Sequence, residues 1–112
     1  MLISHRKDLK PIDVRPGVTK RAPGHNSSEM QVSEWTLDAG SESEAHVHDF
    51  PVVNYVVKGK ARIRLGNDSE EVVAPGDYYY VPTGVTHGLV VVEEFTVIVF
   101  GPASMSSFQL RH

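Results

Sequence analysis

The sequence predicts an all-β protein, either a sandwich or a closed barrel, built from about eight short strands. Turn-forming residues are frequent, since nine glycines and seven prolines are spread through the 112 residues. The segments between them are rich in β-branched and aromatic side chains, which are typical of strands. No window of useful length shows the 3.6-residue periodicity of an amphipathic helix.

The expected strands are bounded by these turn signals. Residues 61–65 alternate apolar and basic side chains, as a half-buried strand does. Residues 52–57 and 95–100 are nearly continuous apolar runs, typical of strands covered on both faces. In chain order the expected strands are Met30–Leu37, Ala45–His48, Val52–Val57, Ala61–Leu65, Glu70–Val73, Asp77–Val81, His87–Val92 and Phe95–Phe100, with one short helical turn around Ser104–Gln109.

Length and composition predict one domain over residues 1–112, with residues 1–13 as a possible arm and residues 103–112 as a possible tail. The absence of cysteine excludes disulfides, thiolate metal sites and cysteine nucleophiles. A net charge of −3 provides no basic field for nucleic acid. No apolar run approaches the 18 residues of a membrane span, so we expect no membrane partner and a cytoplasmic location.

Three of the six histidines occur in a pattern that suits metal binding. His46 and His48 are two residues apart, so in a strand both imidazoles point to one face. Imidazole suits zinc, copper, iron and nickel. An isolated pair of this kind is more often simply exposed on the surface. A second segment supports the metal-binding interpretation, because a Pro82–Gly84 turn follows one expected strand and places His87 at the start of the next. The remaining histidines, His5, His25 and His112, have no such setting.

These two segments resemble the paired motifs of the cupin superfamily, G-x5-H-x-H-x3,4-E-x6-G and G-x5-P-x-G-x2-H-x3-N. The first runs from Gly40 to Gly59, and the second begins at Gly76. The resemblance implies a double-stranded β-helix, a jelly-roll barrel of the cupin type, with a divalent transition metal (Zn, Ni, Fe or Mn) held by His46, His48 and His87.

The chain departs from the family pattern at the fourth ligand. The glutamate position falls on Val52, or on Val53 with the longer spacing, and the final asparagine position falls on Val91. Three neutral imidazoles still form a workable site. Asp49 is a candidate replacement ligand, and a metal-free cavity that keeps the histidines is the alternative.

By period two, Asn54 and Val56 face the interior together with Val52, and Leu89 and Val91 do so together with His87. The expected substrate pocket contains Asn54, Arg21, Tyr55 and Phe100, although Tyr55 and Phe100 are more often plain core residues. Trp35 and Tyr79 are further candidates for its wall.

Among cupins, the chain is similar to the small group that linearises uronates in pectin and alginate breakdown, although Ile98 and Ser104 replace an acidic and a basic residue of that group. This resemblance implies a metal-dependent enzyme that acts on a small polar molecule such as a sugar acid, by isomerase or lyase chemistry. The alternatives are a three-histidine iron dioxygenase of a diketone or catechol-like substrate, and a cupin that binds a ligand or metal without turnover. We expect a small-molecule ligand and a homodimer, and catalytic residues are not identified.

Overall fold

The computed structural model describes residues 3–23, 29–66 and 69–103. Its described part consists of strands joined by turns and loops, with one turn of 3-10 helix, Arg6–Asp8, near the amino terminus. Among the described residues, no helix has the length and hydropathy needed to cross a membrane. The strands are β1 (Ile12–Arg15), β2 (Val18–Arg21), β3 (Met30–Leu37), β4 (Glu42–His46), β5 (Val52–Leu65), β6 (Ser69–Val73), β7 (Tyr78–Val81) and β8 (His87–Pro102).

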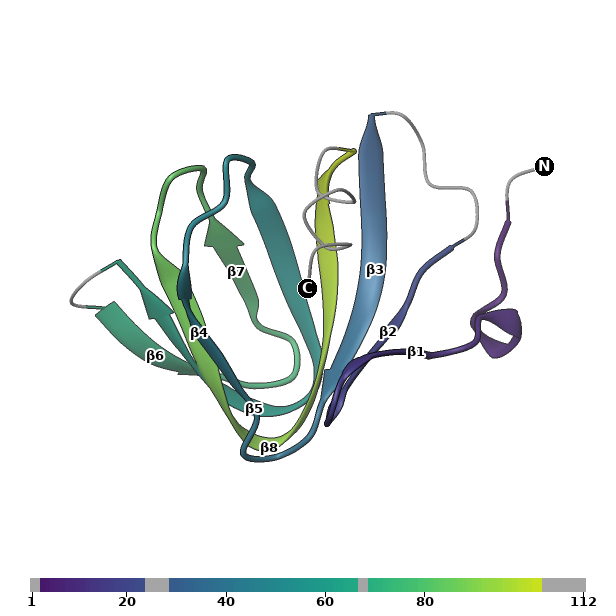
Figure 1. Ribbon diagram of the computed structural model, residues 1–112, viewed down its shortest axis with the longest axis horizontal. Coiled ribbons are helices and arrows are strands. Elements are labelled where there is room, and N and C mark those ends of the chain that lie inside the picture. Colours follow the sequence, from purple (N-terminus) through teal and green to yellow (C-terminus); the bar gives the residue numbers. More distant parts are fainter. Residues whose placement is uncertain (1–2, 24–28, 67–68, 104–112) are drawn as a thin grey trace.

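All strand pairs are antiparallel and form the order β1-β2-β3-β8-β5-β6, with β4 added to β8 and β7 added to β5. The long strands β5 and β8 pair along most of their length and bend together, so the sheet folds over on itself (Figure 1). One half contains β4, β6 and the adjoining ends of β5 and β8, and the other half contains the remaining strands. This arrangement is the all-β jelly-roll barrel that the sequence predicts.

The bend of β5 lies at an irregularity around Gly59. The pairing of β5 with β8 shifts register between Val56 and Ala61. Before the shift the buried residues of β5 have even numbers, and after it they have odd numbers, including Ala61 and Ile63. A β-bulge inserts one extra residue and changes which side chains face inward. The apolar face of β5 therefore points into the barrel on both sides of the bend.

This irregularity corrects two of the expected strand boundaries. The segments expected as 52–57 and 61–65 are one strand, β5, because Gly59 forms a bulge with φ of 81° and not a turn. The segments expected as 87–92 and 95–100 are likewise one strand, β8. The strand expected at 45–48 is displaced to 42–46, so His48 lies just beyond its end.

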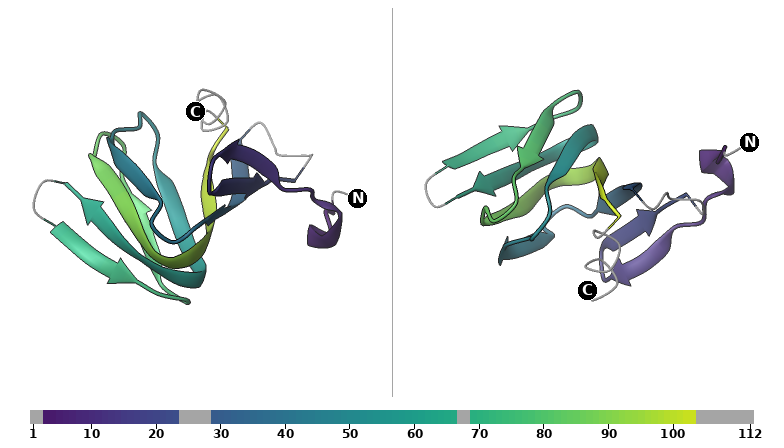
Figure 2. Two further views of the ribbon diagram at one scale, coloured as in Figure 1. Left: turned by 60° about the horizontal axis from the view of Figure 1, so that its bottom comes forward. Right: turned by 90° about the horizontal axis from the view of Figure 1, so that it is seen from above.

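The arm expected over residues 1–13 contains the beginning of a strand that the sequence analysis missed. β1 and β2 form a hairpin through Pro16 and Gly17, and β2 pairs with β3 at the edge of the sheet. Figure 2 shows this hairpin on the side of the barrel away from β6. The side chains of Val14 and Val18 pack into the core from it. The helical turn expected at 104–109 lies outside the described residues.

The core consists of two contiguous groups of buried apolar side chains. The larger group lies inside the bend and contains Val18, Leu37, Val56, Ala61, Ile63, Val73, Val91, Phe95 and Val97. The smaller group contains Phe50, Val52 and Val81 and lies beside the histidines described below.

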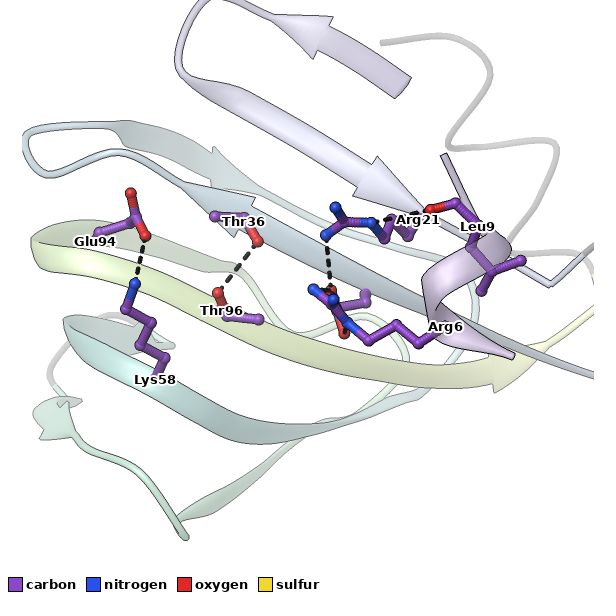
Figure 3. Close-up of polar contacts among 8 residues, drawn as sticks. Arg6, Leu9, Arg21, Thr36, Lys58, Glu94 and Thr96 are labelled. Atoms are coloured by element: carbon purple, nitrogen blue, oxygen red, sulfur yellow. Dashed lines mark hydrogen bonds and ion pairs between the residues drawn. The ribbon is translucent and has the colours of Figure 1, made fainter. Parts of the chain in front are cut away.

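The opposite face of the strands carries polar contacts (Figure 3). Arg6 donates to both carboxylate oxygens of Glu34 at 2.8–3.2 Å, and Arg21 lies 3.4 Å from the same carboxylate. The Arg6 guanidinium lowers the pKa of the Glu34 carboxyl by hydrogen bonding. Lys58 and Glu94 form a further exposed ion pair. The contact between Arg6 and Glu34 connects the amino-terminal turn to the outer face of the sheet.

Candidate metal centre

Three imidazoles from two chain segments meet inside the barrel: His46 and His48 from one segment, and His87 from the other. One ring nitrogen each of His46, His48 and His87 lies within 4.8 Å of the other two. The ring centroids are 4.2–4.9 Å apart, and the rings are tilted rather than stacked. All three side chains are half-buried. Imidazole nitrogens are ligands that suit transition metals, so three of them this close together could share one cation.

The two motif segments are tied to each other by backbone hydrogen bonds. His46 is directly opposite His87 in the β4–β8 ladder. The Gly84 N–H in the Pro82–Gly84 turn donates to the carbonyl of His48 at 3.0 Å. Gly84 has φ of 79°, which glycine adopts without steric cost. The turn therefore connects the segment that carries His48 to the segment that carries His87.

A second glycine allows β4 to approach β8 closely beside the cluster. A Cβ atom on Gly88 would lie 2.9 Å from the carbonyl oxygen of Ser43 and 3.4 Å from the nitrogen of Ala45. A side chain at this position would push β4 outward, and with it the adjacent His46. Gly88 thus has a positional role that the histidine pattern alone does not indicate.

The tautomer of His87 is determined by a backbone carbonyl. Its Nδ1 lies 3.2 Å from the carbonyl oxygen of Val85, which can only accept, so Nδ1 carries the proton and Nε2 keeps its lone pair. Burial lowers the pKa of His87, the hydrogen bond to Val85 acts in the opposite direction, and the neighbouring His46 lowers it further. Burial thus favours the neutral ring that a metal ligand needs, and Nδ1 has the backbone partner usual for ligating histidines.

His48 packs on an aromatic side chain that the sequence analysis did not single out. Its ring stacks on Phe50 with centroids 4.6 Å apart and an interplanar angle of 11°. The Nδ1 atom of His48 is buried and accepts no hydrogen bond from the described residues. A buried nitrogen of this kind is compatible with a bond to a cation. Phe50 is two residues beyond His48, so the alternation around the H-x-H pair could have indicated this contact.

The imidazoles line a cavity of about 170 Å³. An apolar cavity of roughly 150 Å³ is large enough for benzene, so this one suits a ligand of comparable size. Besides the histidines, its polar lining consists of Arg15, Ser43, Asn54 and Tyr79. No Asp or Glu among the described residues lines it. The apolar part of the wall is formed by Val14, Val18, Trp35, Leu37, Phe50, Val52, Val81, Leu89, Val97 and Val99.

Of the four expected pocket residues, only Asn54 lines this cavity. It is buried, and its side-chain amide donates to the carbonyl of Tyr79 at 3.4 Å. Tyr55 and Phe100 lie outside the cavity, because alternation along β5 and β8 directs them to the opposite face from Asn54 and Val99. Tyr55 instead contacts the ring of Tyr78.

Arg21 also lies away from the cavity. It is directly opposite Glu34 in the β2–β3 ladder and donates to the carbonyl of Leu9 at 3.1 Å. The arginine that does line the cavity is Arg15, at the end of β1. The sequence analysis missed it because it expected no strand before Met30, so nothing directed Arg15 toward the barrel. The apolar pair Val14 and Val18 on either side of the Pro16–Gly17 turn is the signal that could have indicated the hairpin.

Neither candidate for a fourth protein ligand joins the cluster. Val52 lines the cavity and is 5% exposed, but its side chain cannot coordinate a cation. Val53 is exposed on the other face of β5. Asp49 is exposed and is not part of the histidine group. Within the described residues, the possible ligand set is therefore three neutral imidazoles.

The fold and the cluster define a small jelly-roll barrel with three imidazoles in its cavity. The sequence profile of the cupin domain matches residues 33–100, which is more than half of the chain. The chain belongs to the cupin family. It is 36% identical over 75 residues to an uncharacterized protein of Streptomyces coelicolor, covering 65% of this chain and 70% of that protein.

Solved structures show the same fold. A cupin of the RmlC-like type from Shewanella frigidimarina has a TM-score of 0.84 at 26% identity, covering 94% of this chain and 93% of the other. KdgF from a Halomonas species has a TM-score of 0.79 at 23% identity, covering 88% and 92%. The polyketide cyclase RemF from Streptomyces resistomycificus has a TM-score of 0.80 at 24% identity, covering 92% and 80%. The last two likenesses concern the fold alone.

Proposed function

We propose that this cupin is a metal-dependent enzyme in which His46, His48 and His87 hold one divalent transition metal, Zn, Ni, Fe or Mn. The observation that carries the proposal is the meeting of three imidazole nitrogens within 4.8 Å inside a cavity. When bound, such a metal supplies Lewis acidity to an oxygen atom of the ligand. Three protein ligands leave coordination positions for that ligand.

The chain's own residues would orient the ligand and exclude water. Val52, Val81 and Leu89 surround the histidines with apolar surface, and Asn54 offers an amide on the cavity wall. None of the described lining residues is a carboxylate or a lysine. Proton transfer by a protein acid–base pair is therefore not part of the proposed mechanism, and polarisation by the cation is its main element.

The cavity favours a ligand with few hydroxyl groups over the sugar acid that the family resemblance implies. Each buried polar group left without a partner costs about 1–3 kcal/mol. A sugar acid carries several hydroxyls, whereas Ser43, Asn54 and Tyr79 are the only uncharged polar side chains of the described wall apart from the histidines. Three assays separate the candidate activities. Uptake of oxygen with acetylacetone would indicate a dioxygenase, and turnover of an unsaturated uronate would indicate a sugar-acid enzyme. Binding without turnover would indicate a non-catalytic cupin.

The metal centre is tested by elemental analysis of the purified protein and its variants. The wild type is expected to hold about one metal ion per chain, and His48→Ala is expected to weaken metal binding by more than about 100-fold, since even partners of metal ligands contribute about 10–100-fold. His5→Ala is the matched control, because His5 is exposed and lies at the 3-10 turn. Equal metal content in His48→Ala and the wild type would contradict the assignment.

The homodimer and the cytoplasmic location remain predictions. Several large apolar side chains on the outer face of the sheet are exposed, including Val53, Tyr78, Tyr80 and Phe100. Exposed apolar surface of this kind is found at protein–protein contacts. Light scattering on the purified chain would measure its mass directly, and a monomer at all concentrations would contradict the expected dimer.

A further inference from the structure

The charge of the cavity leads to an inference about the ligand, which rests on the proposed metal centre. The three histidines would be neutral ligands, because imidazole binds a metal ion in its uncharged form, and Nδ1 of His87 donates to the carbonyl of Val85. Val52 lines the cavity, and in the motif that the chain resembles it stands at the glutamate position. A divalent cation at this site would therefore keep its full charge of about +2, because none of the described residues that line the cavity is an anion.

The rest of the described wall does not compensate for this charge. No Asp or Glu lines it, and its one other charged side chain, Arg15, is itself a cation. Most of the surface around the histidines is apolar, for example Val52, Val81 and Leu89. An uncompensated charge in apolar surroundings is costly, so a ligand that brings negative charge is strongly favoured.

The walls also restrict the body of the ligand. Trp35, Val97 and Val99 continue the apolar surface away from the histidines. The volume of about 170 Å³ accommodates an apolar body of roughly the size of a substituted benzene. Asn54 contributes a neutral amide, and burial raises the pKa of the Tyr79 hydroxyl, so that this group remains a protonated donor.

We propose that the site selects a small oxyanion with an apolar body, such as a carboxylate or an enolate, and that Val52 is the residue that creates this preference by withholding a carboxylate from the metal. The ligand supplies the negative charge that the family's usual glutamate would supply. Neutral molecules of the same shape, and anions covered with hydroxyls, are expected to bind less well.

The probes are benzoate, acetylacetonate, glucuronate and benzamide, titrated into the Co²⁺-loaded protein and followed by the visible absorption of the cobalt ion. Benzamide has nearly the shape of benzoate but no charge, and glucuronate has the charge but a hydroxylated body. Benzoate is expected to bind at least about tenfold more tightly than either. Comparing benzoate with acetylacetonate separates a carboxylate ligand from an enolate.

Two substitutions isolate the charge at position 52. Val52→Glu adds an anionic ligand and Val52→Gln adds a neutral one of nearly the same size. Both are expected to tighten cobalt binding. Only Val52→Glu is expected to weaken benzoate binding, by at least about tenfold, because its carboxylate cancels about half of the charge of the cation.

The outcomes distinguish the two proposals. Wild-type protein that binds no cobalt overturns the metal centre and this inference with it. Protein that binds cobalt but does not distinguish benzoate from benzamide overturns the inference alone. Equal benzoate affinity in the two variants also overturns it, and if Val52→Glu does not fold, the wild-type comparison of the four probes decides the question without it.

Discussion

The inner and outer faces of the same strands differ in chemistry and in what they contribute. On the inner face, β5 and β8 present Val52, Asn54 and Val99 to the histidine cavity. The next residue along each strand points to the outer face. These residues are Tyr55, which contacts the exposed Tyr78, and Phe100, which is itself exposed. Because side chains alternate along a strand, a shift by one residue exchanges the two faces. Burial and site chemistry are therefore decided by register more than by residue type.

The largest expected effect on stability comes from a substitution on the inner face, compared with the same substitution on the outer face. Phe95→Ala removes a side chain that is 0% exposed and is expected to cost about 3–5 kcal/mol of unfolding free energy, because a cavity is left in the core. Phe100→Ala removes the same type of side chain from the same strand, where it is 40% exposed, and is expected to cost about 1 kcal/mol or less. Urea unfolding followed by circular dichroism measures both. Similar costs would contradict the assignment of the two faces.

The next effect concerns the bulge that keeps β5 facing inward on both sides of the bend. An alanine Cβ at position 59 would overlap the carbonyl oxygen of Glu94, and φ is 81° there. Gly59→Ala is expected to destabilise the fold by about 2–4 kcal/mol, from the left-handed backbone together with the overlap. Gly40→Ala is the matched control, since φ is 87° but a Cβ there would meet no atom within 4 Å. Thermal unfolding compares the two variants, and an equal loss would show that the close approach to β8 is unimportant.

The smallest effect concerns the ion pairs of the outer face. Hydrogen bonding from Arg6 lowers the pKa of Glu34 below its usual 4.5. A lowered pKa in the folded state gives stability above the unfolded pKa, and this stability is lost as pH falls through the folded value. Glu34→Gln is therefore expected to be slightly destabilising at pH 7, and the difference from the wild type should shrink below about pH 4.5.

Urea unfolding at pH 7 and pH 3 measures that difference. Glu70→Gln is the control. Among the described ion pairs Glu70 has a single partner, the exposed Arg64, and exposed pairs of this kind contribute little to the free energy of unfolding. A loss in Glu34→Gln that stays constant between the two pH values would contradict the role given to its charge.

Much of the site was predictable because it depends on local spacing. The H-x-H pair and the Pro–Gly turn before His87 are short-range patterns, and the family resemblance that they carry led directly to the three histidines that the structure brings together. Asn54 was predictable from alternation with Val52. By contrast, Tyr55 and Phe100 were chosen for their residue type, against the alternation that excludes them from the cavity.

The sequence alone determined the all-β class, the cupin family, the three candidate ligands and the apolar residue at position 52, because each depends on composition or on spacing within one short segment. Only the tertiary structure decided that β5 and β8 pass through both halves of the barrel, that Gly59 is a bulge, and that Phe50 packs on His48. It also decided that the β1–β2 hairpin brings Arg15 to the cavity. These features depend on contacts between residues far apart in the chain, and turn signals do not specify which strands pair or where a register shifts.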